Sequence, residues 1–161
     1  MKKMFYPPLL PLLLTACRVA LPPSIHIDAR EQNNRLYAPD GNAAGLIRTE
    51  RGECLDIHGD DHRSLIRHAC RGKANQLFRM DNSSNTIRQN GRCLDVAGSE
   101  TRDGSRVILF QCNGKDNQRW YWDGDRIRSA DSGKCLDASD SCLAIRACNG
   151  GREQRFGWGG R

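Results

Sequence analysis

The pentapeptide Gly91-Arg92-Cys93-Leu94-Asp95 occurs in two further forms, Gly52-Glu53-Cys54-Leu55-Asp56 and Gly133-Lys134-Cys135-Leu136-Asp137. An Ile-Arg pair precedes each form, and the three pairs begin at positions 47, 87 and 127, a regular spacing of 40 residues. Self-similarity at a fixed period of this length indicates a fold built from copies of one structural unit. We therefore expect three copies of a single unit.

The second half of the unit recurs as well. A later cysteine is followed six residues on by glutamine, any residue and an aromatic ring, and these triplets are Gln76-Leu77-Phe78, Gln118-Arg119-Trp120 and Gln154-Arg155-Phe156. Short β-forming stretches lie between clusters of Gly, Asp and Asn, which is typical of an all-β barrel or sandwich. Threefold repetition favours a closed form with pseudo-threefold symmetry.

This pattern resembles the ricin B-chain type of β-trefoil lectin domain, whose repeats carry Cys-x-Asp and end in Gln-x-Trp. The resemblance covers about residues 46–161 and implies an all-β fold, a β-trefoil with repeats at 46–86, 87–126 and 127–161. Phe78 and Phe156 stand where the family prefers Trp. We interpret them as core substitutions that keep a large apolar ring.

Eight cysteines in 161 residues indicate an oxidising compartment. The resemblance implies three disulfides, which join Cys54 to Cys70, Cys93 to Cys112 and Cys135 to Cys148. Cys142 is then left over. It is expected to be a free thiol, and the alternatives are competition for Cys135 or Cys148 and a bond to another molecule.

The N-terminus has the features of an export signal. Lys2 and Lys3 precede a short apolar stretch that ends in Leu14-Thr15-Ala16-Cys17, and this order is typical of a secretory signal. The ending resembles a bacterial lipoprotein signal, which implies that cleavage leaves Cys17 as the lipid-bearing residue. Arg18, in place of an aspartate after that cysteine, resembles the pattern of lipoproteins retained at the outer rather than the inner membrane. The expected domains are a signal at 1–17, a flexible tether at 18–44 and the β-trefoil at 45–161. The expected location is the bacterial outer membrane or cell surface, with secretion or the periplasm as alternatives.

Strand periodicity places one set of polar and aromatic side chains together in the second repeat. Side chains two residues apart share a face, so a bridge from Cys93 to Cys112 would bring Asp95 and Phe110 onto one face of adjacent strands. The residues expected to face the core instead are Leu94, Val96, Val107 and Leu109. A ring can stack on the C–H face of a pyranose while a carboxylate accepts hydrogen bonds from its hydroxyls.

The resemblance implies a carbohydrate site in the second repeat at Asp95, Phe110, Asn117 and Gln118. Two structural alternatives remain, in which Asp95 only orients Gln118 and Phe110 packs under a loop. In the first repeat the corresponding residues are Asp56, His68, Asn75 and Gln76.

The first and third repeats each depart from the residues expected of a carbohydrate site. In the first, His68 replaces the platform ring, and the inward position before it holds Arg67, which predicts a local distortion. In the third, Arg146 stands at the platform position and Glu153 at the Asn position beside Asp137. This repeat is expected to be structural, although Arg146 could meet an acidic group.

The remaining features argue against other functions. The net charge of +6 comes from scattered single Arg residues, so no nucleic-acid partner is expected. His58 and His62 flank a turn and predict no metal site, and no cofactor or catalytic motif is present, so an enzyme is not expected. The expected partners are glycans, of galactose type or acidic, and a membrane reached through the lipid. The alternative is a protein-interaction scaffold, such as a lectin-like toxin subunit.

Overall fold

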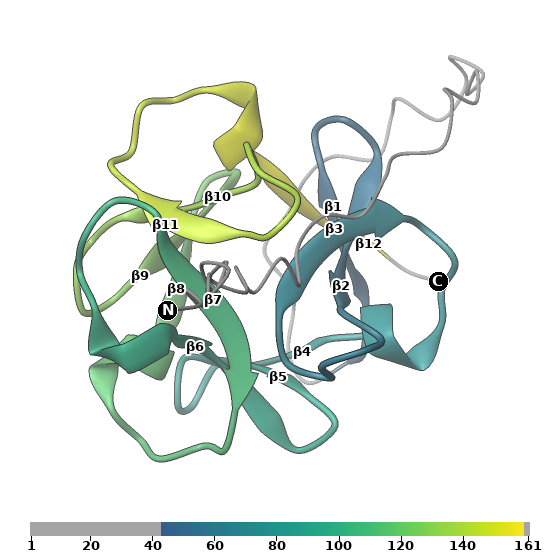
Figure 1. Ribbon diagram of the computed structural model, residues 1–161, viewed down its shortest axis with the longest axis horizontal. Helices are drawn as coiled ribbons and strands as arrows, with labels where there is room; N and C mark the ends of the chain where they lie inside the picture. The colour runs from purple at the N-terminus through teal and green to yellow at the C-terminus, as the bar shows by residue number, and fades with distance from the viewer. Residues whose placement is uncertain (1–42, 160–161) are drawn as a thin grey trace, which may run out of the picture.

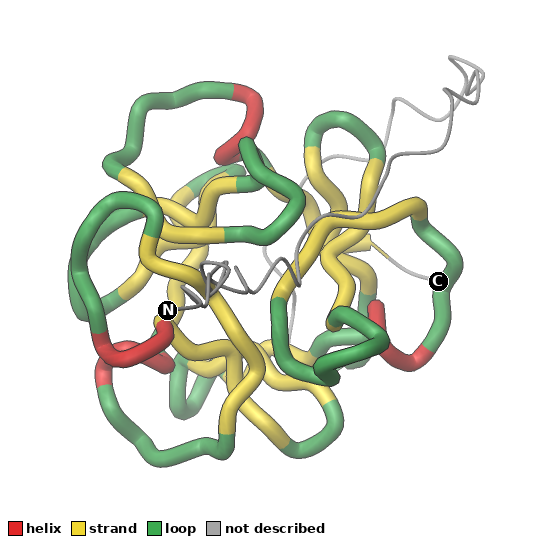
Figure 2. The backbone as a smooth tube through the Cα atoms, in the orientation of Figure 1, coloured by secondary structure: helices red, strands yellow, loops and turns green. Residues whose placement is uncertain are grey.

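The computed structural model describes residues 43–159. The signal, the tether and Cys17 lie outside the described residues. Within them the chain forms twelve β-strands, four short 3-10 turns and no α-helix, so the all-β expectation is confirmed. Figures 1 and 2 show how the strands and the connecting loops are arranged. No helix in this part of the chain is long and apolar enough to cross a membrane.

Four strands come from each repeat. The first repeat contains β1 (Leu46–Thr49), β2 (Glu53–Ile57), β3 (Leu65–Ala69) and β4 (Arg79–Asp81). The second contains β5 (Thr86–Gln89), β6 (Arg92–Val96), β7 (Ser105–Phe110) and β8 (Trp120–Asp123). The third contains β9 (Arg126–Ser129), β10 (Cys135–Asp137), β11 (Ala144–Arg146) and β12 (Phe156–Gly159). The 3-10 turns are η1 (Ala74–Gln76), η2 (Ala97–Ser99), η3 (Asp116–Gln118) and η4 (Arg152–Gln154).

The repeats are joined in a closed ring. The last strand of each repeat pairs antiparallel with the first strand of the next, since β4 pairs with β5, β8 with β9, and β12 returns to β1. The repeated glycine precedes the second strand of each repeat and has a positive φ in all three, at Gly52, Gly91 and Gly133. Because glycine lacks a Cβ it adopts this conformation without strain, which explains why the same residue recurs at this turn.

The middle strands of each repeat form a hairpin, and the three hairpins meet. The hairpins are β2–β3, β6–β7 and β10–β11, and they surround a common centre in Figure 1. Bridges join Ser64 to Ile108 and Ile66 to Cys142, and β11 pairs with β7. Loops from one repeat therefore lie against strands of the next, and a site on one hairpin can include residues from its neighbour.

The core follows the alternation expected from the sequence. Leu94, Val96, Val107 and Leu109 all belong to the buried cluster. The ring of Trp120 and the rings of Phe78 and Phe156 are buried at equivalent places in the three repeats. The interpretation of the two phenylalanines as core substitutions is therefore confirmed. Burying each large ring contributes about 1.5–3 kcal/mol relative to leaving it in water.

Each hairpin is closed by a disulfide. The bonds join Cys54 to Cys70, Cys93 to Cys112 and Cys135 to Cys148, the pairs that the resemblance implies. The expectation of a free Cys142 is wrong, because this cysteine is also disulfide-bonded and no free cysteine occurs among the described residues. Cys142, which lies outside the named strands, forms an isolated β-bridge with Ile66, and a repeat pattern with two cysteines per unit could not assign it a disulfide partner.

The expected distortion at Arg67 is also wrong. Arg67 lies opposite Leu55 in an unbroken ladder from β2 to β3, just as Leu109 lies opposite Leu94 in the second repeat. The guanidinium is accommodated because Nη1 donates to both Glu53 carboxylate oxygens, at 3.0 and 2.8 Å, and Nε donates to the Asp140 carbonyl. A charge at an inward position is tolerated when it is paired and hydrogen-bonded.

Candidate carbohydrate-binding sites

A buried aspartate–glutamine pair occupies the same place in all three repeats. The glutamine Nε2 donates to the aspartate at 2.8 Å in Gln76–Asp56, 2.7 Å in Gln118–Asp95 and 2.9 Å in Gln154–Asp137. Each glutamine also donates to the carbonyl that precedes the second cysteine and accepts a backbone N–H beyond that cysteine. The pair therefore ties the second strand to the loop after the third, and this part of its role is structural in every repeat.

The second repeat adds an exposed ring to this frame. Phe110 lies opposite Cys93, and Asp95 lies opposite Ile108 on the same face of the ladder. The Phe110 side chain is 44% exposed, so it is not packed away under a loop. Asn117 is buried beside the pair and donates from Nδ2 to the Val96 carbonyl at 3.1 Å. The structure thus brings the four residues of the predicted second-repeat site together.

A basic residue of the first repeat reaches over this ring. The Arg63 guanidinium carbon lies 5.4 Å from the centre of the Phe110 ring. The Arg63 carbonyl accepts the Leu109 N–H at 2.7 Å, and the Arg63 N–H donates to Asp61 Oδ1 at 2.9 Å. These contacts hold the loop of one repeat against the platform of the next. No pattern in the sequence predicts this contact, because Arg63 and Phe110 belong to different repeats.

Burial changes the acidity of the two site carboxylates. It raises the pKa of Asp95 above the usual aspartate value of 3.8, although hydrogen bonds from Gln118 and Asn117 oppose the rise. Burial also raises the pKa of Asp56, against hydrogen bonds from Gln76 and Asn75. Both groups are therefore easier to protonate than an aspartate in water.

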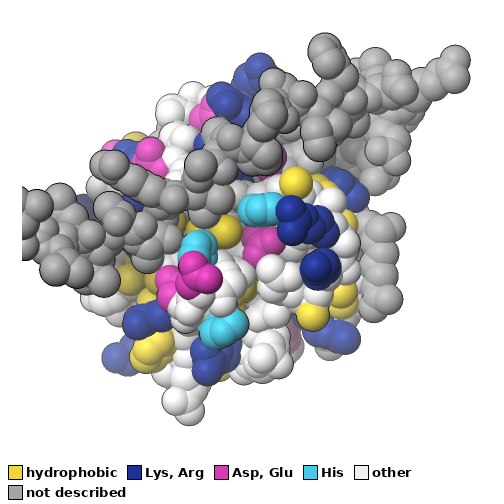
Figure 3. All heavy atoms as spheres, turned by 45° about the vertical axis from the view of Figure 1, so that its right-hand side comes forward, with side chains coloured by type: hydrophobic (Ala, Val, Ile, Leu, Met, Phe, Trp, Pro, Cys, Tyr) yellow, Lys and Arg dark blue, Asp and Glu magenta, His cyan; other side chains and the backbone are white. Residues whose placement is uncertain are grey.

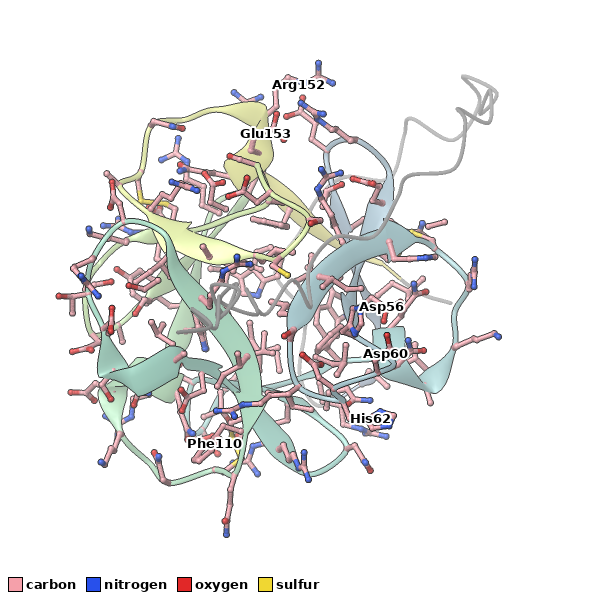
Figure 4. The ribbon with its side chains drawn as sticks, viewed as in Figure 1. Asp56, Asp60, His62, Phe110, Arg152 and Glu153 are labelled. Carbon is pink, nitrogen blue, oxygen red and sulfur yellow. A yellow bond between two sulfur atoms is a disulfide. The ribbon has the colours of Figure 1, made fainter. Side chains whose placement is uncertain are left out.

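The first repeat forms the more enclosed hollow. A cavity of about 280 Å³ is lined by Asp56, His68, Asn75 and Gln76, which are the four residues predicted for this repeat, and also by His58, Gly59, Asp60, Ile66, Arg71 and Lys73. Its volume is close to the lower end of the range of about 300–1,000 Å³ found for small-molecule sites. Figure 3 shows the three described histidines on one face together with acidic and basic side chains, and Figure 4 places Asp56 close to Asp60.

The Asp56 carboxylate keeps acceptor capacity toward this cavity. Asn75 Nδ2 donates to Oδ1 at 2.6 Å and Gln76 Nε2 donates to Oδ2 at 2.8 Å. An ionised carboxylate offers about four lone-pair positions, so these two bonds leave room for sugar hydroxyls. His68 lies opposite Cys54 in the ladder, at the place that Phe110 holds in the second repeat. An imidazole can stack there and also donate or accept a hydrogen bond.

The polar side chains at the site positions of the third repeat are engaged by other protein groups. Asp137 accepts bonds from the Ser139 N–H, the Ser139 hydroxyl and Gln154, and Arg146 Nε lies 3.6 Å from Oδ1. The same Arg146 donates to Asp140 at 2.8 Å. Glu153, at the Asn position, pairs with Arg51 of the first repeat, and Figure 4 shows it at that edge of the molecule. At the positions that correspond to the second-repeat site, the third repeat therefore has no exposed ring, and its aspartate is engaged by protein groups.

The turn that carries His58 and His62 is held by local hydrogen bonds. The Asp60 N–H donates to His58 Nδ1 at 3.2 Å, and His62 lies in a turn with a φ of 49°. No group of three or more His, Cys, Asp or Glu side chains in residues 43–159 is arranged to hold a metal ion.

Comparison with known proteins places the chain in a family. The ricin-type beta-trefoil lectin domain matches residues 43–156, so the chain belongs to this family. A probable lipoprotein of Salmonella typhimurium, EnvE, is 41% identical over 69 residues, which are 43% of this chain but only 39% of that protein.

Solved structures agree with this assignment. An agglutinin from Abrus precatorius is similar with a TM-score of 0.67 and 22% identity, over 77% of this chain and 51% of that one. The hemolytic lectin CEL-III is similar with a TM-score of 0.64 and 29% identity, over 73% of this chain and 30% of that one. The chain is therefore a β-trefoil of the lectin type, and it spans about half or less of the proteins it resembles here.

Proposed function

We propose that this protein is a non-catalytic glycan-binding protein that recognises sugars mainly through its second repeat. The observation that carries the proposal is the shared face of Asp95 and Phe110, where a buried carboxylate lies beside an aromatic ring that is 44% exposed. Membership of a lectin-type family and the similarity to lectins support the same function.

The site would bind a pyranose by two complementary contacts. The C–H face of the sugar stacks on the Phe110 ring, and adjacent hydroxyls donate to Asp95. Gln118 holds Asp95 in place, since its amide is fully engaged by protein groups and does not itself need the sugar. Asn117 lies beside the carboxylate and would supply the remaining polar contact. A galactose-type sugar, with an apolar face and a polar edge, suits this arrangement.

The cavity of the first repeat would serve as a second site. It holds the same carboxylate and amides, with His68 in place of the ring. Two weak sites on one chain raise the apparent affinity for a surface that carries many glycans, because the second contact is made within the same complex.

The protein would act from a membrane surface. The ending at Cys17 and the partial similarity to a probable lipoprotein support a lipid anchor at the bacterial outer membrane or cell surface, with the segment 18–44 as the tether. The three disulfides fit an exported protein. Lipid chains contribute about 0.8 kcal/mol for each buried CH₂, which suffices for stable anchoring when two signals combine.

A glycan array of the full chain tests the proposal. The Phe110→Ala variant should lose binding to the glycans that the unchanged protein captures. Tyr121→Ala is the matched control, because Tyr121 is also an exposed ring, 38% exposed, with an arginine stacked over it, and it lies outside both candidate sites. If the unchanged protein binds no glycan, the scaffold function replaces the lectin function. If Phe110→Ala binds as well as the unchanged protein, the second repeat is not the main site.

A further inference from the structure

A lysine recurs at one position in the two repeats that keep the site asparagine. Lys73 immediately precedes η1, which carries Asn75, and Lys115 immediately precedes η3, which carries Asn117. The two lysines also have nearly the same backbone conformation, with φ and ψ of −77° and 163° at Lys73 and of −76° and 158° at Lys115. The third repeat has Gly151 at this place, and it has also lost the asparagine. The lysine therefore accompanies the site and is absent where the site is absent.

Both lysines line hollows, and neither forms a salt bridge with another residue of the described range 43–159. Lys73 lines the first-repeat cavity with Asp56, and Lys115 lines a second hollow of about 410 Å³ with Asn117. Arg71, which also lines the first cavity, likewise forms no salt bridge within the part of the chain that the structure describes, whereas Arg146 of the third repeat pairs with Asp140. The charge of Lys115 is felt at the site carboxylate, since it helps to lower the pKa of Asp95 against the effect of burial.

We propose that Lys73 and Lys115 select glycans that carry a single acidic group, a carboxylate or a sulfate. This inference rests on the proposed function of the two sites. A lysine ammonium is a compact charge with three donors on a flexible stem, so it can meet an anionic substituent in several geometries. The hydroxyls of the same ligand would reach the aspartate at the other end of the site.

The acidic residues around each hollow restrict this ligand class. Asp56 and Asp60 line the first cavity beside Lys73 and Arg71. Asp116 and Asp131 line the second hollow beside Lys115, and Asp116 pairs with Arg119. A polyanion would bring negative charge against these carboxylates, which is unfavourable. A glycan with one acidic group can direct that group to the lysine and its hydroxyls to the acidic side.

The test compares one glycan in neutral and acidic forms. Lactose, its sialylated form and its sulfated form are titrated into the purified full chain, its Lys73→Gln/Lys115→Gln variant and a Lys134→Gln control. The Lys134→Gln substitution removes the same kind of charge, but Lys134 pairs with Asp103 and lines neither hollow. The unchanged protein should bind the acidic forms on the order of fivefold more tightly, a preference that salt weakens. The double variant should lose that preference, because its affinity for the acidic forms falls to its affinity for lactose.

The outcomes separate this inference from the function on which it rests. Equal affinity of the unchanged protein for neutral and acidic forms would overturn the role of the lysines while leaving the lectin function intact. An equal loss in the Lys134→Gln control would also overturn it, because the preference would then reflect net charge alone. Absence of binding to every form would overturn the proposed function and this inference together.

Discussion

Arg63 lies over the exposed ring of Phe110, with 5.4 Å between the guanidinium carbon and the ring centre, although the two residues come from different repeats. The contact links the loop between β2 and β3 to the end of β7. A cation over an exposed ring contributes about 0.5–1 kcal/mol, and a sugar that stacks on the covered part of the ring must displace it.

Removal of this guanidinium should therefore open the platform. In the Arg63→Ala variant we expect the affinity for a neutral glycan to rise about twofold to fivefold, because the sugar no longer competes with the cation. Isothermal titration calorimetry with a galactose-type glycan measures the change. A loss of affinity would mean instead that Arg63 contacts the sugar itself.

The buried glutamine should matter for stability whether or not sugar is bound. Gln118→Ala leaves Asp95 and the Asn113 N–H without their partner inside the protein, which should lower the free energy of unfolding by about 2–4 kcal/mol. Denaturant unfolding measures the loss. Gln111→Ala is the control, since that neighbouring side chain is exposed and its removal should cost less than about 0.5 kcal/mol. Equal losses in the two variants would contradict the structural role of the pair.

Glycan affinity should fall in acid earlier than an ordinary aspartate would allow. Burial raises the pKa of Asp95 and of Asp56 above 3.8, so both carboxylates are protonated, and lose part of their capacity as acceptors, while the pH is still above that value. The effect on the fold has the opposite sign, because protonation in the folded state relieves the cost of burying the charge. Binding measured across acidic pH should decline above 3.8 in the unchanged protein, and the curve of the Asp95→Asn, Asp56→Asn double variant should be flat over the same range. Affinity that stays constant down to pH 3.8 would be evidence against hydroxyl recognition by these carboxylates.

The proposed lipid anchor requires that Cys17 carry the lipid. In a lipoprotein the sulfur of this first mature residue carries the lipid. A lipidated Cys17 sulfur cannot form a disulfide. Mass spectrometry of the mature protein should therefore find lipid on Cys17. A mature protein that begins at another residue, or whose Cys17 carries no lipid, would exclude the anchor.

Most of the fold could be predicted from the sequence, because the same motif recurs in each repeat. The Gly-x-Cys-Leu-Asp motif fixes a turn, a disulfide and an inward leucine, and its alternation correctly placed Leu94 and Leu109 in the core. The same regularity could not account for residues that depart from it. Arg67 is tolerated at an inward position only because Glu53 and the Asp140 carbonyl receive it, and those partners are visible only in three dimensions.

Site residues that belong to one repeat could be predicted from the sequence, whereas contacts between residues of different repeats could not. Strand spacing brought Asp95 and Phe110 to one face, since both belong to a single hairpin. The positions of Arg63 over that hairpin and of His58 and Asp60 around the first cavity depend on how loops fold back, which spacing does not encode. The enclosed shape of the first-repeat cavity was likewise not evident from the replacement of a ring by His68.

The central claim, that the second repeat binds sugar on the face shared by Asp95 and Phe110, is tested most directly by nuclear magnetic resonance. A galactose-type glycan is titrated into the isotopically labelled full chain, and the backbone amide shifts are followed. The account predicts that the signals of Asp95, Phe110 and Asn117 move with a common saturation curve, while those of Asp137 and Arg146 in the third repeat do not. A titration that leaves the second-repeat signals in place, or that moves all three repeats alike, would contradict it.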